Sequence, residues 1–139
     1  MITRMFQGDE PGVRELYAIC HPGEAEQPTD WYFVYPTLVV ILDSKVVGFT
    51  SFTVTTMPGF GQTMYGQDIC VHPDYRGKGL AEALHTERLN ICRRLDIQTF
   101  LGVTGRENKG MVKVLEKAGA HSCINIGNDI MFVGTVGGT

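Results

Sequence analysis

The chain has 139 residues, of which 43% are hydrophobic and 19% are charged. This length and balance are those of one folded domain, since a division into two domains would leave each half with little core. The 12 Lys and Arg against 15 Asp and Glu give a formal net charge of −3, without the basic excess typical of nucleic-acid binding. We therefore expect a single domain over residues 1–139 that takes no nucleic acid as a partner.

The sequence shows no membrane or secretion signal. Its longest apolar run, Leu38–Leu42, is far shorter than the ~20 residues of a membrane span, and its N-terminal stretch holds no apolar run. The four cysteines and four histidines are scattered, without a Cys-x-x-Cys pair or the spacing of zinc ligands. We expect a cytoplasmic protein with reduced, mostly buried thiols, no membrane contact and no metal.

The first half of the chain predicts a helix among antiparallel strands. An apolar stripe at helical spacing predicts a helix from Glu10 to Cys20. Residues Met1–Phe6 alternate in polarity as a short edge strand does. Three further strands, joined by two tight turns, are predicted over residues 35–42, 46–56 and 62–72.

In the second half, helices alternate with strands. Two apolar stripes predict helices over residues 76–95 and 111–118, the second ending at Gly119. Strands are predicted over residues 98–104, 121–126 and 130–136. The long helix permits a parallel crossover between strands 62–72 and 98–104. The order β-α-β-β-β-α-β-α-β-β predicts an α/β fold, with a mixed, mostly antiparallel sheet of about seven strands and helices on both faces.

The most informative stretch runs from Val71 to Ala81. A strand ends before Pro73, and a turn that contains Gly77 and Gly79 opens the long helix. The first amides of a helix lack internal partners and carry the positive end of its dipole, and glycines let a phosphate approach them. Arg76 and Lys78 add positive charge. This pattern predicts a pyrophosphate cradle, against the alternative of a turn that only reverses the chain.

Two common nucleotide motifs do not fit this turn. A P-loop needs Ser or Thr after its lysine, but Lys78 is followed by Gly79. The Rossmann fingerprint needs a third glycine where this chain has Glu82. The cradle therefore belongs to another class of phosphate-containing ligand.

The turn resembles the acyl-CoA signature of the GNAT family of N-acetyltransferases, Arg/Gln-x-x-Gly-x-Gly/Ala. This chain has Arg76-Gly77-Lys78-Gly79-Leu80-Ala81 at that place. A second motif of the family, an Asn followed by an amphipathic helix and a Gly, matches Asn108 and Gly119. The predicted order of strands and helices agrees with the family over essentially the whole chain, so the resemblance implies a GNAT-like fold.

The resemblance implies acetyl-CoA as co-substrate and a primary amine, on a small molecule or a peptide, as acceptor. The end of strand 62–72 would pair with the pantetheine arm through its backbone, and the glycine-rich turn would hold the pyrophosphate. The acetyl thioester would lie where strands 62–72 and 98–104 separate. The residues that the resemblance assigns to acyl-CoA binding are Ile69, Cys70, Val71, Arg76, Gly77, Lys78, Gly79, Leu80, Ala81 and Asn108.

The resemblance leaves the proton-transfer residues open. Many family members have a tyrosine acid where this chain has Leu115, and the best-known members have a glutamate base where it has Tyr65. Asp68, His72 and Tyr65 are therefore the candidate catalytic bases, with Asp68 preferred. A salt-bridged carboxylate and a surface histidine are the alternatives for Asp68 and His72.

Two questions about function follow from the same residues. Leu115 keeps open a non-catalytic acyl-CoA-binding or regulatory domain of the same fold as the alternative to an enzyme. Segment 24–35, with Trp31 and Tyr32, would shape the acceptor side, and an acidic, aromatic mouth would suit a cationic or aromatic amine. A homodimer is compatible with the sequence, which does not identify the oligomeric state.

Overall fold

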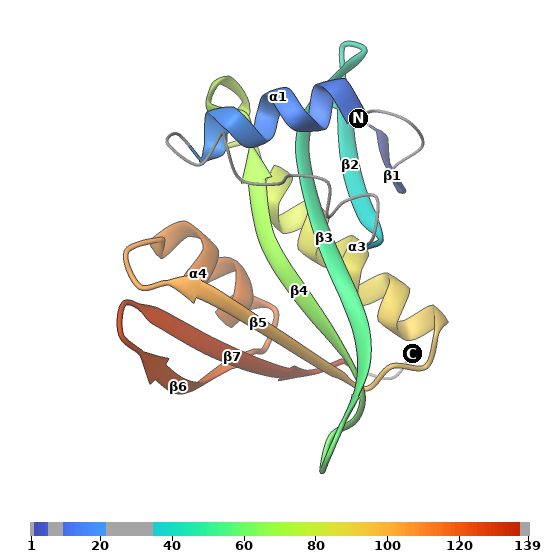
Figure 1. The fold of residues 1–139 in the computed structure, drawn as a ribbon, viewed down its shortest axis with the longest axis vertical. Coiled ribbons are helices and arrows are strands. Elements are labelled where there is room, and N and C mark those ends of the chain that lie inside the picture. Colours follow the sequence, from blue (N-terminus) through green and yellow to red (C-terminus); the bar gives the residue numbers. More distant parts are fainter. Residues whose placement is uncertain (1, 6–9, 22–34, 137–139) are drawn as a thin grey trace. The chain divides into compact units, whose positions relative to one another are not determined.

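The structure is a computed structural model that describes residues 2–5, 10–21 and 35–136. Seven strands form one hydrogen-bonded sheet in the order β1-β2-β3-β4-β5-β7-β6 (Figure 1). The strands are β1 (Ile2–Met5), β2 (Thr37–Leu42), β3 (Lys45–Met57), β4 (Gly61–Val71), β5 (Thr99–Gly105), β6 (His121–Ile126) and β7 (Asp129–Thr135). The helices are α1 (Glu10–Cys20), α3 (Leu80–Arg94) and α4 (Lys109–Lys117), with the short 3-10 helix η1 (Pro73–Tyr75) between β4 and α3.

The strand pairing confirms the predicted mixed sheet. Strand β4 pairs with β5 in parallel, whereas the β1–β2, β2–β3, β5–β7 and β6–β7 pairs are antiparallel. The predicted strands and helices are present, with bounds that differ by a few residues. The largest difference is the long helix, which begins at Leu80 and not at residue 76. Gly77 and Gly79 have φ angles of +76° and +79°, which a right-handed helix cannot contain.

The chain divides into two compact units. One consists of Met1–Ser51 with Ile69–Leu84, and the other of Phe52–Asp68 with His85–Thr139. Strands β3 and β4 and helix α3 therefore each contribute to both units. The single domain that the length indicates stays a prediction. No helix in the described ranges is long and apolar enough to cross a membrane.

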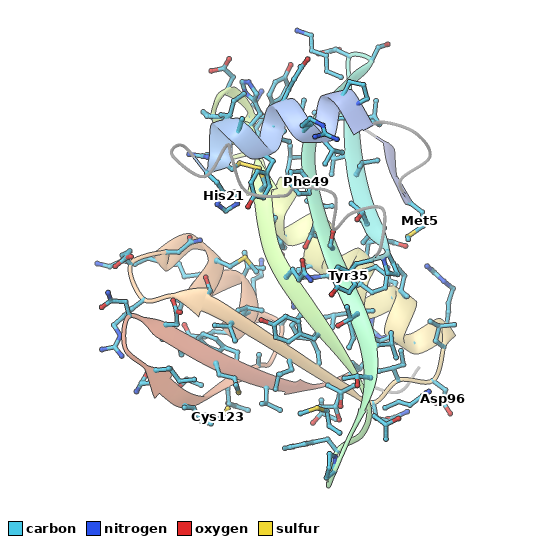
Figure 2. The ribbon with its side chains drawn as sticks, in the orientation of Figure 1. Met5, His21, Tyr35, Phe49, Asp96 and Cys123 are labelled. Atoms are coloured by element: carbon cyan, nitrogen blue, oxygen red, sulfur yellow. A yellow bond between two sulfur atoms is a disulfide. The ribbon has the colours of Figure 1, made fainter. Side chains whose placement is uncertain are left out.

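In the first unit, the pleat of β2 and β3 separates two layers of side chains. Val39 and Phe49 pack with Val13 and Leu16 of α1 and with Cys70 of β4. Figure 2 labels Phe49 at this helix. Because successive residues of a strand face opposite ways, Val40 and Gly48 turn away from α1. A Cβ atom on Gly48 would lie 3.4 Å from Cδ1 of Leu84 in α3, so helices cover both faces of these strands, as predicted.

A disulfide joins Cys20, the last residue of α1, to Cys70 of β4. Figure 2 draws it as a yellow bond near the labelled His21. The prediction of reduced thiols is wrong for this pair, because the packing of α1 on β4 brings Cα atoms 50 residues apart in sequence to 6.0 Å. Cys92 and Cys123 are not disulfide-bonded. The cytoplasmic location stays a prediction.

In the second unit, α4 is held at both ends and through its buried side. Asn108 caps its start, since Oδ1 accepts a hydrogen bond from the Met111 amide at 3.3 Å. Gly119 follows its end with a φ of +94°, which agrees with the predicted helix terminus. Leu115 is only 2% exposed, so the predicted apolar stripe is buried at this residue, whereas Ala118 at its end is exposed.

We expect the Cys20–Cys70 bond to raise the free energy of unfolding by ~2–4 kcal/mol, because it closes a long loop in the unfolded chain. Denaturant unfolding of the oxidised protein, the dithiothreitol-reduced protein and Cys20→Ala measures this difference. The matched control is Cys123→Ala, which removes an exposed thiol outside the disulfide. An unfolding midpoint that does not change when thiol titration shows full reduction would contradict a stabilising role for the bond.

Candidate functional site

The turn between η1 and α3 has the geometry of an open anion-binding loop. Gly77 and Gly79 both adopt left-handed φ angles, and a Cβ atom on either would meet nothing within 4 Å. Glycine is therefore required here by the backbone conformation, while the space beside it is clear. Leu80 is 4% exposed and anchors the start of α3. The amide of Ala83 donates to the Gly79 carbonyl at 3.0 Å, so the hydrogen-bonded turns of α3 begin directly at this loop.

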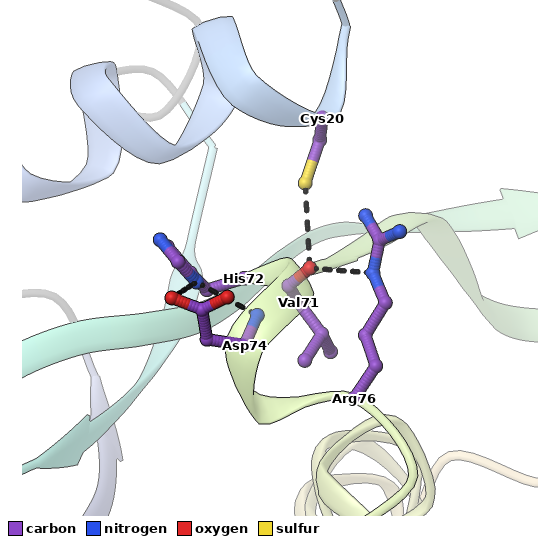
Figure 3. A network of polar contacts seen from close by, with 5 residues as sticks. All are labelled: Cys20, Val71, His72, Asp74 and Arg76. Atoms are coloured by element: carbon purple, nitrogen blue, oxygen red, sulfur yellow. Dashed lines mark hydrogen bonds and ion pairs between the residues drawn. The ribbon is translucent and has the colours of Figure 1, made fainter.

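Two cations flank this turn. Nε of Arg76 donates to the Val71 carbonyl at 3.0 Å, which ties the loop to the end of β4 (Figure 3). Nζ of Lys78 lies 5.3 Å from the centroid of the Tyr75 ring, a cation–π distance. The same stretch carries acidic groups at Asp74 and at Glu82 in the first turn of α3. The acidic and basic side chains of this stretch offset one another in net charge. An anion at this turn would therefore be attracted mainly by the oriented amides and by the cations nearest to it.

His72 is the N-cap of η1. Its Nδ1 accepts a hydrogen bond from the Asp74 amide at 3.1 Å (Figure 3). Its own amide donates to the Val47 carbonyl at 2.8 Å. Because Nδ1 acts as the acceptor, the ring proton is on Nε2 in this arrangement. A role of His72 as general base would have to replace this capping bond or use water, and it stays a prediction.

At the end of β4, the Cys70 side chain is buried in the core. Cys70 is bonded to Cys20 and packs against α1, so its side chain is not an available thiol in this form. The Val71 carbonyl accepts from Arg76, and the Cys20 sulfur lies 3.8 Å from the same oxygen. A disulfide sulfur carries no hydrogen, so the dashed line between Cys20 and Val71 in Figure 3 is a close contact. The Cys70 side chain is therefore not available to a ligand at Ile69–Val71.

In the second unit, β4 pairs with β5 from Thr63 opposite Thr99 to Gly66 opposite Gly102. Sδ of Met64 lies 3.6 Å from Sγ of Cys92 in α3, so Tyr65 is on the other face of the strand. Burial raises the pKa of the Cys92 thiol to about 11, which keeps it protonated near neutral pH and excludes it as a nucleophile there. Tyr65 is half-buried and stays a candidate.

The predicted residues fall into two groups. The structure brings Val71, His72 and Arg76 together in the first unit. Tyr65 and Asn108 belong to the second unit. Asp68 lies in β4, but its side chain is outside the described part of the chain, as is segment 24–34 of the predicted acceptor side. Among the described residues, no group of three or more His, Cys, Asp or Glu is placed to hold a metal.

The sequence reading missed a buried polar cluster of His85 and Arg88 on α3. Arg88 is 1% exposed and His85 is 2% exposed. Burial, and secondarily the Arg88 charge, lowers the pKa of His85 to about 3. The available signal was the position of Arg88, four residues after Leu84 and on the stripe that continues to Cys92. A cation on the buried stripe of a helix is uncommon and indicates a specific partner.

Comparisons with known proteins agree with this geometry. The model of the Acetyltransferase (GNAT) family matches residues 10–120. The structure of yncA from Salmonella typhimurium with its cofactor acetyl-CoA is 19% identical with a TM-score of 0.77, covering 100% of this chain and 95% of that chain. The GNAT family N-acetyltransferase YhbS from Escherichia coli in complex with CoA is 20% identical with a TM-score of 0.76, covering 98% of this chain and 81% of that one.

A third solved structure is the ribosomal-protein-alanine N-acetyltransferase from Brucella melitensis, 15% identical with a TM-score of 0.77, covering 97% of this chain and 99% of that chain. At these identities the solved structures show a shared fold. A search of curated sequences finds no significant match. The family model, however, spans most of the chain and both of its motifs. The chain therefore belongs to the GNAT family of acetyltransferases.

Proposed function

We propose that this protein transfers an acetyl group from acetyl-CoA to a primary amine of a small molecule or a peptide. The observation that carries the proposal is the open, left-handed turn at Gly77 and Gly79, which lies at the N-terminus of α3 beside Arg76 and Lys78. Family membership and the CoA-containing structures of the same fold support acetyl-CoA as the donor.

In this proposal, two segments of the first unit bind different parts of the donor. The amides from Gly77 to Ala81 hold the pyrophosphate, and Arg76 and Lys78 add favourable charge. The backbone of Ile69–Val71 pairs with the pantetheine arm as an added strand would. Because the Cys70 side chain is committed to the core, this pairing depends on backbone groups alone. In the second unit, the exposed Asn108 is proposed to contact pantetheine in addition to capping α4.

The acceptor must lose a proton before it attacks. A lysine-like amine with a pKa of ~10.4 is almost wholly charged near neutral pH. We assign the removal of this proton to Asp68, directly or through water, with Tyr65 and His72 as the alternatives. The amine then attacks the thioester carbonyl directly, and CoA leaves as the thiol or thiolate.

Leu115 is the residue that favours the alternative function, a non-catalytic acyl-CoA-binding domain. It is buried and apolar, so it cannot donate a proton to the leaving thiolate. A thiol with a pKa near ~8.5 is nevertheless a tolerable leaving group without a dedicated acid. Release of free CoA against a panel of amines, with mass spectrometry of the products, distinguishes an enzyme from a binding domain.

Gly79→Glu should abolish acetyl-CoA binding, because it places a side chain and a negative charge in the open turn. The matched control is Gly59→Glu in the β3–β4 turn, where φ is +84° and a Cβ atom also meets nothing within 4 Å. Isothermal titration calorimetry of both folded variants measures the effect. Equal acetyl-CoA affinity in Gly79→Glu and Gly59→Glu would exclude this turn as the pyrophosphate site.

Asp68→Asn should lower kcat/KM for the amine by ~10²–10⁴-fold and remove the basic group from its pH profile. Affinity for acetyl-CoA should be retained, because the substitution leaves the turn at Gly79 intact. The control is Asp96→Asn, which changes an exposed carboxylate after α3. An unaltered pH–rate profile in Asp68→Asn would reject the assignment and favour Tyr65 or His72 as the base.

Leu115→Ala should lower the free energy of unfolding by ~2–5 kcal/mol, as expected for a buried leucine. Turnover per folded molecule should change little, because the side chain takes no part in proton transfer. Denaturation midpoints and activity normalised to the folded fraction test both statements. A large loss of turnover with acetyl-CoA affinity intact would show that this side chain lies in the reaction site.

A further inference from the structure

The buried cluster on α3 is organised around a single guanidinium. Nη2 of Arg88 lies 3.0 Å from Nδ1 of His85, and the Arg88 guanidinium carbon lies 5.0 Å from the centroid of the Phe100 ring. His85 meets the same ring edge-on at 4.8 Å. A guanidinium can only donate, so Nδ1 of His85 accepts and its ring is neutral.

A further contact of this guanidinium reaches the backbone of β4. Nη1 of Arg88 donates to the Gln67 carbonyl at 2.8 Å. Gln67 is the residue after Gly66, which forms the last of the parallel pairs with β5. Strand carbonyls in a sheet normally accept hydrogen bonds from the amides of a neighbouring strand. At Gln67, where the ladder with β5 ends, the donor to the carbonyl is instead a side chain of α3.

The sequence of β4 and β5 makes room for this contact. A Cβ atom on Gly66 would lie 2.5 Å from Nη1 of Arg88 and 2.5 Å from Cζ of Phe100. Gly102, opposite Gly66, would place its own Cβ atom 3.1 Å from Phe100. Both glycines therefore leave space that the Phe100 ring fills, and Gly66 also leaves space for the guanidinium.

We propose that Arg88 is a positioning residue for acetyl transfer: its hydrogen bond to Gln67 fixes the course of β4 immediately before Asp68 and Ile69–Val71. The inference rests on the proposed function, which assigns the base and the pantetheine-binding backbone to those residues. A buried cation is costly, and an apolar side chain of similar size would fill the core at less cost. The specific gain from arginine is a rigid donor aimed at one carbonyl, which an apolar residue cannot provide.

Three substitutions separate the hydrogen bond from the charge. Arg88→Lys keeps the charge and a donor, Arg88→Gln keeps a donor without charge, and Arg88→Met removes both. If the bond to Gln67 positions β4, Arg88→Met should lose ~10- to 100-fold in kcat and raise KM for acetyl-CoA. Arg88→Gln and Arg88→Lys should each recover a large part of that loss. The matched control is Arg94→Met, which removes an exposed arginine of the same helix and should leave both parameters unchanged.

The kinetic parameters are measured on variants whose folding is checked by circular dichroism and thermal unfolding. A folded Arg88→Met with wild-type kcat and KM would overturn the inference. If Arg88→Met does not fold, the comparison of Arg88→Gln with Gly66→Ala decides. If the hydrogen bond positions β4, the kcat of Arg88→Gln should exceed that of Gly66→Ala. If only the charge of Arg88 matters, the kcat of Arg88→Gln should not exceed that of Gly66→Ala. A wild-type protein that neither binds acetyl-CoA nor acetylates any amine would refute the proposed function, whereas intact wild-type activity with insensitive Arg88 variants refutes only the role of Arg88.

Discussion

The candidate site depends on how the backbone of one strand, β4, is satisfied along its length. From Thr63 to Gly66 the strand is paired in parallel with β5. Beyond Gly66, the Gln67 carbonyl accepts from Arg88 and the Val71 carbonyl accepts from Arg76, so side chains supply donors at two positions. Strand backbone that is not fully engaged by neighbouring strands can pair with an extended ligand, which is the role proposed for Ile69–Val71.

The two arginines, Arg76 and Arg88, differ in burial. Arg76 is exposed, so its charge is available to an anion while its Nε is used to hold the turn. Arg88 is buried, and its guanidinium contacts the neutral acceptor His85 and the face of Phe100. Burial is the main cause of the low pKa of His85, and the Arg88 charge lowers it further. The proposed roles are therefore ligand attraction for the exposed Arg76 and strand positioning for the buried Arg88.

Much of the fold and the turn could be predicted from local sequence. Apolar stripes at helical spacing located α1, α3 and α4. The helix start at residue 76 was wrong because periodicity does not register the left-handed φ of Gly77 and Gly79. The Cys20–Cys70 bond and the contact of Arg88 with Gln67 join residues far apart in sequence, so neither spacing nor composition could reveal them.

The central claim is that the turn at Gly77–Ala81 and the end of β4 together bind the donor. Amide nuclear magnetic resonance of the labelled protein, titrated with CoA, tests it residue by residue. We expect the largest shift changes on Gly77, Gly79, Ala81 and Ile69–Val71, because their amides are proposed to contact the pyrophosphate and pantetheine. Saturable binding with the largest changes elsewhere, and with these amides unmoved, would contradict it.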